Sequence, residues 1–232
     1  MDGKRILVVY TNKNDPRLPN DAGGAFIPEA MAFAKLHKVP ETNMLGVPCP
    51  GMPAGKRREA VCDFFRGHTD GKIEMIAWFG HGYSTGIQFG FNIQTIPQLV
   101  EYMKLCCADD VSMIFYACST GSTNKKTRAI KSPGTNNGFA DKVRDYMLWA
   151  GFRGGWIDGH LKPGHTTLQP FLLRFYVEPM FEGIWDVPGG EWIISPKGPL
   201  WKKWRDAIQT KGSTFKFLIP FAAQAEIMEM LS

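Results

Sequence analysis

Short runs of apolar residues, set among polar and glycine- or proline-rich segments, constrain this chain most. They lie at residues 5–10, 43–47, 73–79, 111–117 and 152–157. Near-continuous apolar runs of this length are typical of strands that are buried on both faces of a sheet. Apolar residues at helical spacing separate the runs, at residues 27–36 (with Pro28 in the first turn), 56–65, 95–107 and 138–150. This alternation predicts an α/β fold: a mainly parallel, doubly wound sheet flanked by helices, in three layers.

The pattern weakens after residue 160. Residues 171–177 fit either a helix or a strand, residues 201–208 suit a helix, and residues 215–219 suit a last strand. A length of 232 residues corresponds to one large domain or two small ones, at about 150 residues per domain. We expect one domain over residues 1–232, with a core at 1–160 and an extension at 161–232 that completes the sheet and the substrate side.

Composition and charge exclude several classes of protein. Apolar residues make up 44% of the chain and charged residues 21%, which excludes a disordered chain. The net charge of +5 is a mild excess with no recognition motif, so we expect no direct nucleic-acid binding. No run approaches the roughly 18 apolar residues of a membrane span, and the N-terminus does not resemble a signal peptide. We therefore expect a cytoplasmic protein without membrane association.

The five cysteines indicate neither disulfides nor a metal site. Their number is odd and no CxxC pair is present, which argues against a disulfide framework and against structural zinc. His68 and His81 with a nearby cysteine have irregular spacing for a metal site. We expect no metal and no organic cofactor.

Two residues just after the expected strands carry the chemistry. The run at 73–79 is followed by Gly80, His81 and Gly82, and the run at 111–117 by Cys118. Ligands gather beyond the C-terminal ends of parallel strands, where these residues would lie side by side. A cysteine beside a histidine is an activated nucleophile. The backbone N–H groups of Gly82 and Cys118 would then face a developing oxyanion.

These motifs resemble the caspase-like (clan CD) cysteine peptidases. In that family, as here, an apolar strand ends in His-Gly and the next ends in Ala-Cys. The run from Ala117 to Gly121 is most similar to CHAT domains, and the resemblance covers residues 1–160 by element order. It implies an intracellular endopeptidase with Cys118 as nucleophile, His81 as general acid and base, and a protein or peptide as substrate. It also leaves open an activating protein partner, and a catalytically silent scaffold or sensor module.

Two aspartates are candidates for binding the substrate side chain before the scissile bond (P1). Residues 18–22 are similar to a metacaspase stretch after the first strand, in which an aspartate binds a basic P1 side chain. By that resemblance Asp21 would line the pocket. The chain departs from metacaspases at Tyr116, where they have an aspartate. Asp158, expected just past the fifth strand, is the second candidate, and both also fit ordinary turn residues.

The segment after Cys118 suggests a further hypothesis. Residues 122–137 are polar and basic, and long for a surface loop. They fit a plain solvated loop, or a linker that the protein itself cleaves, as in caspases. The run from Gly80 to Gly86 also resembles a GxGxxxG dinucleotide loop, but no helix opens directly at it, as that fingerprint requires.

Overall fold

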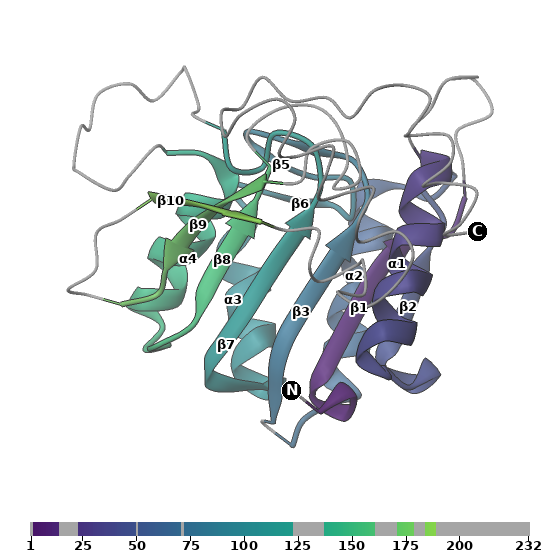
Figure 1. The fold of residues 1–232 in the computed structure, drawn as a ribbon, viewed down its shortest axis with the longest axis horizontal. Helices are drawn as coiled ribbons and strands as arrows, with labels where there is room; N and C mark the ends of the chain where they lie inside the picture. Colours follow the sequence, from purple (N-terminus) through teal and green to yellow (C-terminus); the bar gives the residue numbers. More distant parts are fainter. Residues whose placement is uncertain are drawn as a thin grey trace.

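A seven-stranded mixed sheet forms the centre of the molecule (Figure 1). The computed structural model describes residues 2–13, 23–49, 51–70, 72–122, 137–160, 171–178 and 184–188. The strand order is β10-β9-β8-β7-β3-β1-β2. The strands are β1 (Ile6–Thr11), β2 (Met44–Val47), β3 (Ile73–Phe79), β7 (Cys107–Tyr116), β8 (Trp156–Gly159), β9 (Phe171–Tyr176) and β10 (Ile184–Pro188). Strands β1, β2, β3, β7 and β8 are parallel, whereas β9 and β10 are each antiparallel to their neighbours. The predicted α/β class with a mainly parallel sheet is confirmed.

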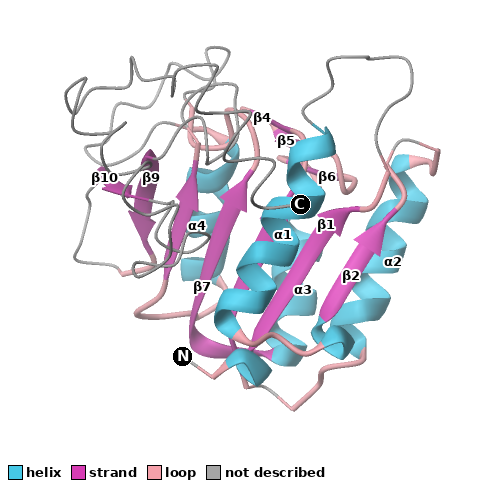
Figure 2. Cartoon of the chain, turned by 45° about the vertical axis from the view of Figure 1, so that its right-hand side comes forward, coloured by secondary structure: helices cyan, strands magenta, loops and turns pink. Residues whose placement is uncertain are grey.

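Helices pack on both faces of the sheet (Figure 2). Helix α1 (Gly23–His37) covers one face, and α2 (Ala54–Arg66), α3 (Ile96–Cys106) and α4 (Phe139–Trp149) cover the other. The chain therefore leaves β1 toward one face and β3 toward the opposite face. In doubly wound sheets, this reversal point is where ligands bind, beyond the carboxyl ends of the strands. None of the helices in the described segments is long and apolar enough to cross a lipid bilayer.

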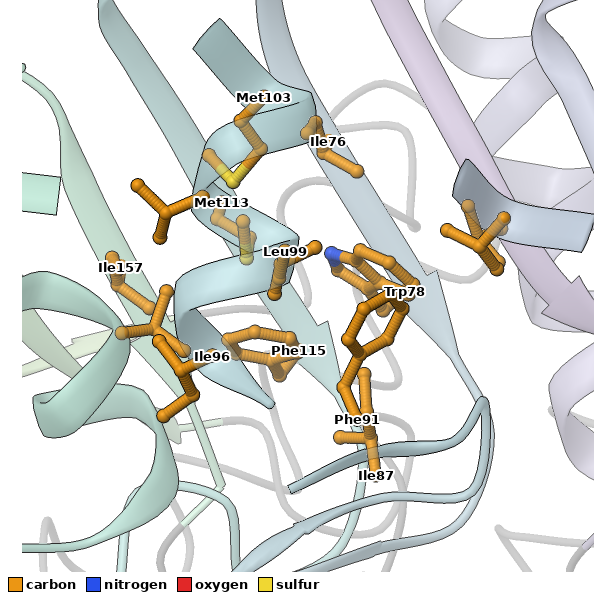
Figure 3. Packing of buried hydrophobic residues seen from close by; sticks show 14 of the residues in the cluster. Ile76, Trp78, Ile87, Phe91, Ile96, Leu99, Met103, Met113, Phe115 and Ile157 are labelled. Atoms are coloured by element: carbon orange, nitrogen blue, oxygen red, sulfur yellow. The ribbon is translucent and has the colours of Figure 1, made fainter. Parts of the chain in front are cut away.

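The larger half of the core lies between the sheet and α2–α4. Trp78 of β3 and Phe115 of β7 stack with ring centroids 6.1 Å apart, and Leu99 of α3 packs with them (Figure 3). Residues 96, 99, 100, 103 and 106 of α3 are all buried, which is the helical spacing of one apolar stripe. The stripe explains why residues 96–106 form a helix that lies flat on the sheet.

The other half of the core lies under α1. Phe26 and Phe33 of α1 are fully buried and pack against β3 and β7. There Phe79 and Tyr116 stack with centroids 4.5 Å apart and 20° between the rings. Two aromatic layers thus fix the paired ends of β3 and β7 from both faces.

Three predicted boundaries are wrong. Helix α1 begins at Gly23, so Pro28 is its sixth residue and not in the first turn; the earlier start brings Phe26 into the core. Strand β7 follows α3 directly at Cys107 instead of starting near residue 111. Strand β8 begins at Trp156, after a turn in which Gly151 and Gly154 have positive φ.

Some elements have no clear sequence signal. Residues 82–92 form a small antiparallel sheet of β4 (Gly82–Tyr83), β5 (Gly86–Ile87) and β6 (Phe91–Asn92). Strands of two residues are too short to show a period. Of the two alternatives for residues 171–177, the structure has the strand, β9, and β10 follows it at the sheet edge. The predicted elements at 201–208 and 215–219 lie outside the described residues.

The α3 stripe yields a stability prediction. Leu99 is fully buried against Trp78 and Phe115, whereas Leu105 on the same helix is 46% exposed. Leu99→Ala should lower the free energy of unfolding by about 2–5 kcal/mol, because a cavity replaces packed atoms. Leu105→Ala is the matched control and should change it by no more than about 0.5 kcal/mol. Urea unfolding monitored by tryptophan fluorescence measures both, and equal losses would contradict this packing.

Candidate functional site

The register between β3 and β7 determines which residues lie together at the candidate site. Phe79 pairs with Tyr116 as the last matched residues of these two parallel strands. His81 and Cys118 each follow two residues later, so they leave the sheet at the same level on neighbouring strands. The sequence predicts this juxtaposition, and both side chains are half-buried.

The backbone at Gly82 lies directly against the backbone at Cys118. A Cβ on Gly82 would lie 2.7 Å from the carbonyl oxygen of Cys118 and 2.8 Å from the Cβ of Ala117. Real Cβ atoms are not found at such distances, so this position needs a glycine. The segment after β3 is therefore in direct contact with the segment after β7.

The small sheet β4–β6 holds His81 in place. The amide of Gln88 donates to the carbonyl of His81 at 2.9 Å. A Cβ on Gly80 would lie 2.8 Å from the ring of Phe89, so the chain turns tightly over that ring. Ile87, Phe89 and Phe91 are buried in the core around Trp78 (Figure 3). These buried side chains attach the small β4–β6 sheet to the core beside the end of β3.

The imidazole of His81 also contacts helix α1. Its ring centroid is 5.3 Å from that of Phe26, with the rings at 86°. Edge-to-face packing of this kind is favourable and orients both rings. Because Phe26 is fully buried, its ring is held by the core and limits the orientations open to the His81 ring.

The turn after Cys118 is held from three directions. The hydroxyl of Thr120 donates to the carbonyl of Ala117 at 3.0 Å. The amide of Gly121 donates to the carbonyl of His160, which follows β8, at 2.9 Å. The carbonyl of Thr120 accepts from the amide of Ala140 in α4 at 3.0 Å. Cys118 therefore sits at the start of a turn that hydrogen bonds connect to the end of β8 and to α4.

Ser119, the next residue, has a φ of 57°. This left-handed conformation is uncommon for a residue other than glycine, and non-glycine residues in it often mark functional sites. The turn is also tight farther along, because a Cβ on Gly121 would lie 2.5 Å from the carbonyl of Gly159.

The direction of the Gly82 backbone N–H follows from the pairing of β4 with β5. Gly82 pairs with Ile87, while the amide of Gln88 bonds to the carbonyl of His81. In an antiparallel ladder this pattern makes Gly82 and Ile87 a pair without mutual hydrogen bonds. The N–H of Gly82 thus points away from β5.

Cys118 differs from the other four cysteines, all of which the structure describes. It is half-buried, whereas Cys49, Cys62, Cys106 and Cys107 are buried. Burial raises the pKa of Cys49, raises that of Cys62 to about 11, and raises that of Cys107 well above its usual range. These three thiols therefore stay protonated at neutral pH. Of the five, Cys118 is the most accessible to a reagent.

Asp158 lies within β8, and not past it as predicted. It is fully buried, and Arg174 of β9 donates to it through Nε and Nη2, each at 2.8 Å. Burial raises the pKa of the Asp158 carboxyl, and the bonds from Arg174 act in the opposite direction. The guanidinium also stacks over Trp156, 4.4 Å from the ring centroid. The carboxylate already has a cationic partner within the protein.

Tyr116 is close to these charges. Burial raises its pKa well above the usual range, and the charges of Asp158 and Glu29 raise it further. The phenol therefore stays neutral.

The other predicted features lie largely outside the described residues. Asp21 belongs to this part of the chain, and so do residues 123–136 of the segment proposed for self-cleavage. Within the described segments, no three His, Cys, Asp or Glu side chains gather as metal ligands would.

Comparisons with protein-family models, with curated proteins and with solved structures found no match to this chain.

Sequence reasoning missed residues that hold the site. Phe26 has an apolar helical pattern, but nothing in the sequence pairs it with His81. Arg174 is in a segment whose type was open, 16 residues from Asp158. One signal in the sequence points to such a pair: Arg174 is the single charge in the apolar run 171–177. A charge in an apolar run needs a partner of opposite charge when the run is buried.

The ion pair under the site yields the second prediction. Asp158→Asn should lower the free energy of unfolding by about 1–3 kcal/mol, because it removes the charge that neutralises the part-buried Arg174 and leaves one of its N–H donors without an acceptor. Asp63→Asn is the control, since the pair between Asp63 and Arg66 is exposed, and it should barely move the unfolding midpoint. Thermal unfolding measures both. Equal, small effects of the two substitutions would contradict a contribution of the Asp158–Arg174 pair to folding.

Proposed function

We propose that this protein is a cysteine endopeptidase of the caspase-like type that hydrolyses peptide bonds through Cys118 and His81. One observation carries the proposal: the Phe79–Tyr116 pairing brings both residues to the same level at adjacent strand ends. A half-buried cysteine beside a half-buried histidine is the arrangement that activates a thiol. The site lies beyond the carboxyl ends of β3 and β7, beside the β1–β3 reversal point.

The chemistry follows from these groups. The thiolate of Cys118 attacks the carbonyl carbon of the scissile peptide bond, and the oxygen becomes an oxyanion. The N–H groups of Gly82 and Cys118 donate to it. His81 protonates the leaving amine, which departs as the new N-terminus of the product. Water then attacks the thioester, His81 accepts its proton, and the acid product leaves with Cys118 regenerated.

The proposed mechanism uses no third catalytic side chain and no cofactor. Edge-to-face packing against Phe26 orients the imidazole of His81. The hydrogen bonds of the turn at 117–121 orient Cys118. These contacts keep both groups near their working geometry before substrate binds. The Asp158 carboxylate is already paired with Arg174, so this residue gives no support for a basic P1 preference.

The function is tested with acyloxymethyl ketones that carry Arg, Lys, Asp, Asn or Leu at P1. We expect modification at Cys118 alone, read by intact mass and peptide mapping, and the best probe identifies the P1 class. His81→Ala should lower the turnover of the matching peptide by about 10²–10⁴-fold, the usual contribution of a general acid–base group. Cys118→Ala should abolish turnover.

Cys62→Ala is the matched control for these variants, because it removes a thiol from the α2 face without touching the site. It should leave probe labelling unchanged. Folded protein in which Cys118 resists every probe would favour the silent scaffold or sensor module instead. Turnover that survives in Cys118→Ala would exclude the mechanism.

We also propose that the enzyme cleaves itself within residues 122–137. Both ends of this segment are anchored: Ser122 Oγ donates to the Ser119 carbonyl at 2.7 Å, and the amide of Asn137 donates to Asp141 at 2.7 Å. Four basic residues lie between these ends, Lys125, Lys126, Arg128 and Lys131. Intact mass after long incubation should show two fragments that meet in this segment, with Cys118→Ala remaining whole. A single full-length species, or equal cleavage of the variant, would refute self-cleavage.

A further inference from the structure

Two neighbouring cysteines lie at the other end of β7 from Cys118. Cys106 is the last residue of α3 and Cys107 is the first of β7, so the helix passes into the strand without a loop (Figure 1). Their Sγ atoms are 3.5 Å apart. Cys106 Sγ otherwise contacts the carbonyls of Tyr102 and Met103, at 3.7 and 3.8 Å. The length of β7 separates this pair from Cys118.

We propose that Cys106 and Cys107 form a modification site that a hydroperoxide oxidises to a reversible disulfide between neighbouring residues. The proposal is independent of the peptidase function and goes beyond it. It rests on two features: the two thiols are already in contact, and the strand beside them is irregular.

The irregular pairing of β7 with β3 would let an oxidant reach the two thiols. Cys107 pairs with Ile73, but the next matched pair is Ser112 with Met75. Four residues of β7, 108–111, therefore face the single residue Glu74 of β3. Bulged segments of this kind disrupt the ladder locally, so we expect this junction to open transiently more often than the regular part of the sheet. Asp109 and Asp110 in the bulge are exposed.

The bulge is nevertheless held closed in the folded protein. The amide of Arg153 donates to the Asp109 carbonyl at 2.7 Å, and Lys104 pairs with the Asp109 side chain at 3.5 Å. Cys107 is 6% exposed and Cys106 fully buried, and burial raises the pKa of Cys107. Oxidation therefore proceeds through the locally open junction, at a rate set by opening.

The two steps balance. The sulfur of the more exposed Cys107 attacks the peroxide, the O–O bond breaks, and a sulfenic acid forms while water or an alcohol leaves. The Cys106 sulfur then attacks that sulfur, the S–O bond breaks, and water leaves with the Cys106 proton. The sulfurs are oxidised by two electrons and the peroxide is reduced. Because the second thiol is held nearby, this step outruns further oxidation of the sulfenic acid.

The resulting disulfide is readily reduced again. Cα atoms across a trans peptide are about 3.8 Å apart, below the about 4.4–6.8 Å usual for disulfides. Strained disulfides have more oxidising potentials and are the labile ones. The pair is thus suited to cycling between thiol and disulfide.

The test uses full-length Cys118→Ala protein. Trypsin cleavage after Lys104 and Lys125 yields one peptide, 105–125, that would otherwise contain a third cysteine. The protein is treated with hydrogen peroxide, unfolded, alkylated with iodoacetamide and digested. We expect peptide 105–125 to lose two hydrogens and take up no alkyl group, and dithiothreitol treatment before alkylation to restore two alkylation sites.

Two further variants complete the test in the same background. Cys107→Ser should give the peptide with Cys106 alkylated and no loss of two hydrogens, whereas Cys62→Ala should leave the result unchanged. The proposal is overturned if treated protein shows both Cys106 and Cys107 alkylated, or either one joined to Cys49 or Cys62. It is also overturned if sulfinic acid accumulates in place of the disulfide.

Discussion

The parallel pairing of β3 with β7 is the constraint on which the site depends. Phe79 and Tyr116 are the last residues of matched register, and their rings stack under α1. On the opposite face, Trp78 and Phe115 stack under α3. If β7 slipped by one residue against β3, Phe115 and Tyr116 would each turn to the wrong face and lose their stacking partners. The same packing that stabilises the sheet therefore fixes where the chain leaves each strand.

Close backbone contacts bring together the segments that follow the strands. Gly82 lies against the carbonyl of Cys118, and Gly121 against that of Gly159. Neither position has room for a side chain, so the segments after β3, β7 and β8 close on one another. The small β4–β6 sheet and Phe26 of α1 then support His81. The proposed dyad is thus supported by residues from both faces of the sheet.

Much of this architecture is predictable from the sequence, for a physical reason. Strands buried on both faces appear as continuous apolar runs, and α3 has its stripe at regular spacing. The juxtaposition of His81 and Cys118 follows from those runs, because parallel strands align their carboxyl ends.

What escapes prediction depends on contacts between distant segments or on very short elements. Strands β4–β6 have two residues each, too few for a pattern. Asp158 lies inside β8 because the strand continues to Gly159, two residues past the end of the apolar run. Its pairing with Arg174 needs the antiparallel β8–β9 register, which no local signal specifies.

The central claim is that His81 activates Cys118, and the pH dependence of Cys118 alkylation tests it most directly. The rate of reaction with iodoacetamide is measured for the protein and for His81→Ala, with peptide mapping to isolate Cys118. An unassisted thiol has a pKa of about 8.5, whereas a neighbouring imidazolium lowers it to about 3.5–7.5. At pH values below the ordinary thiol pKa, we expect His81→Ala to slow the alkylation of Cys118 by roughly tenfold or more, which corresponds to one pKa unit. Superimposable profiles, both rising as an ordinary thiol titrates, would contradict it.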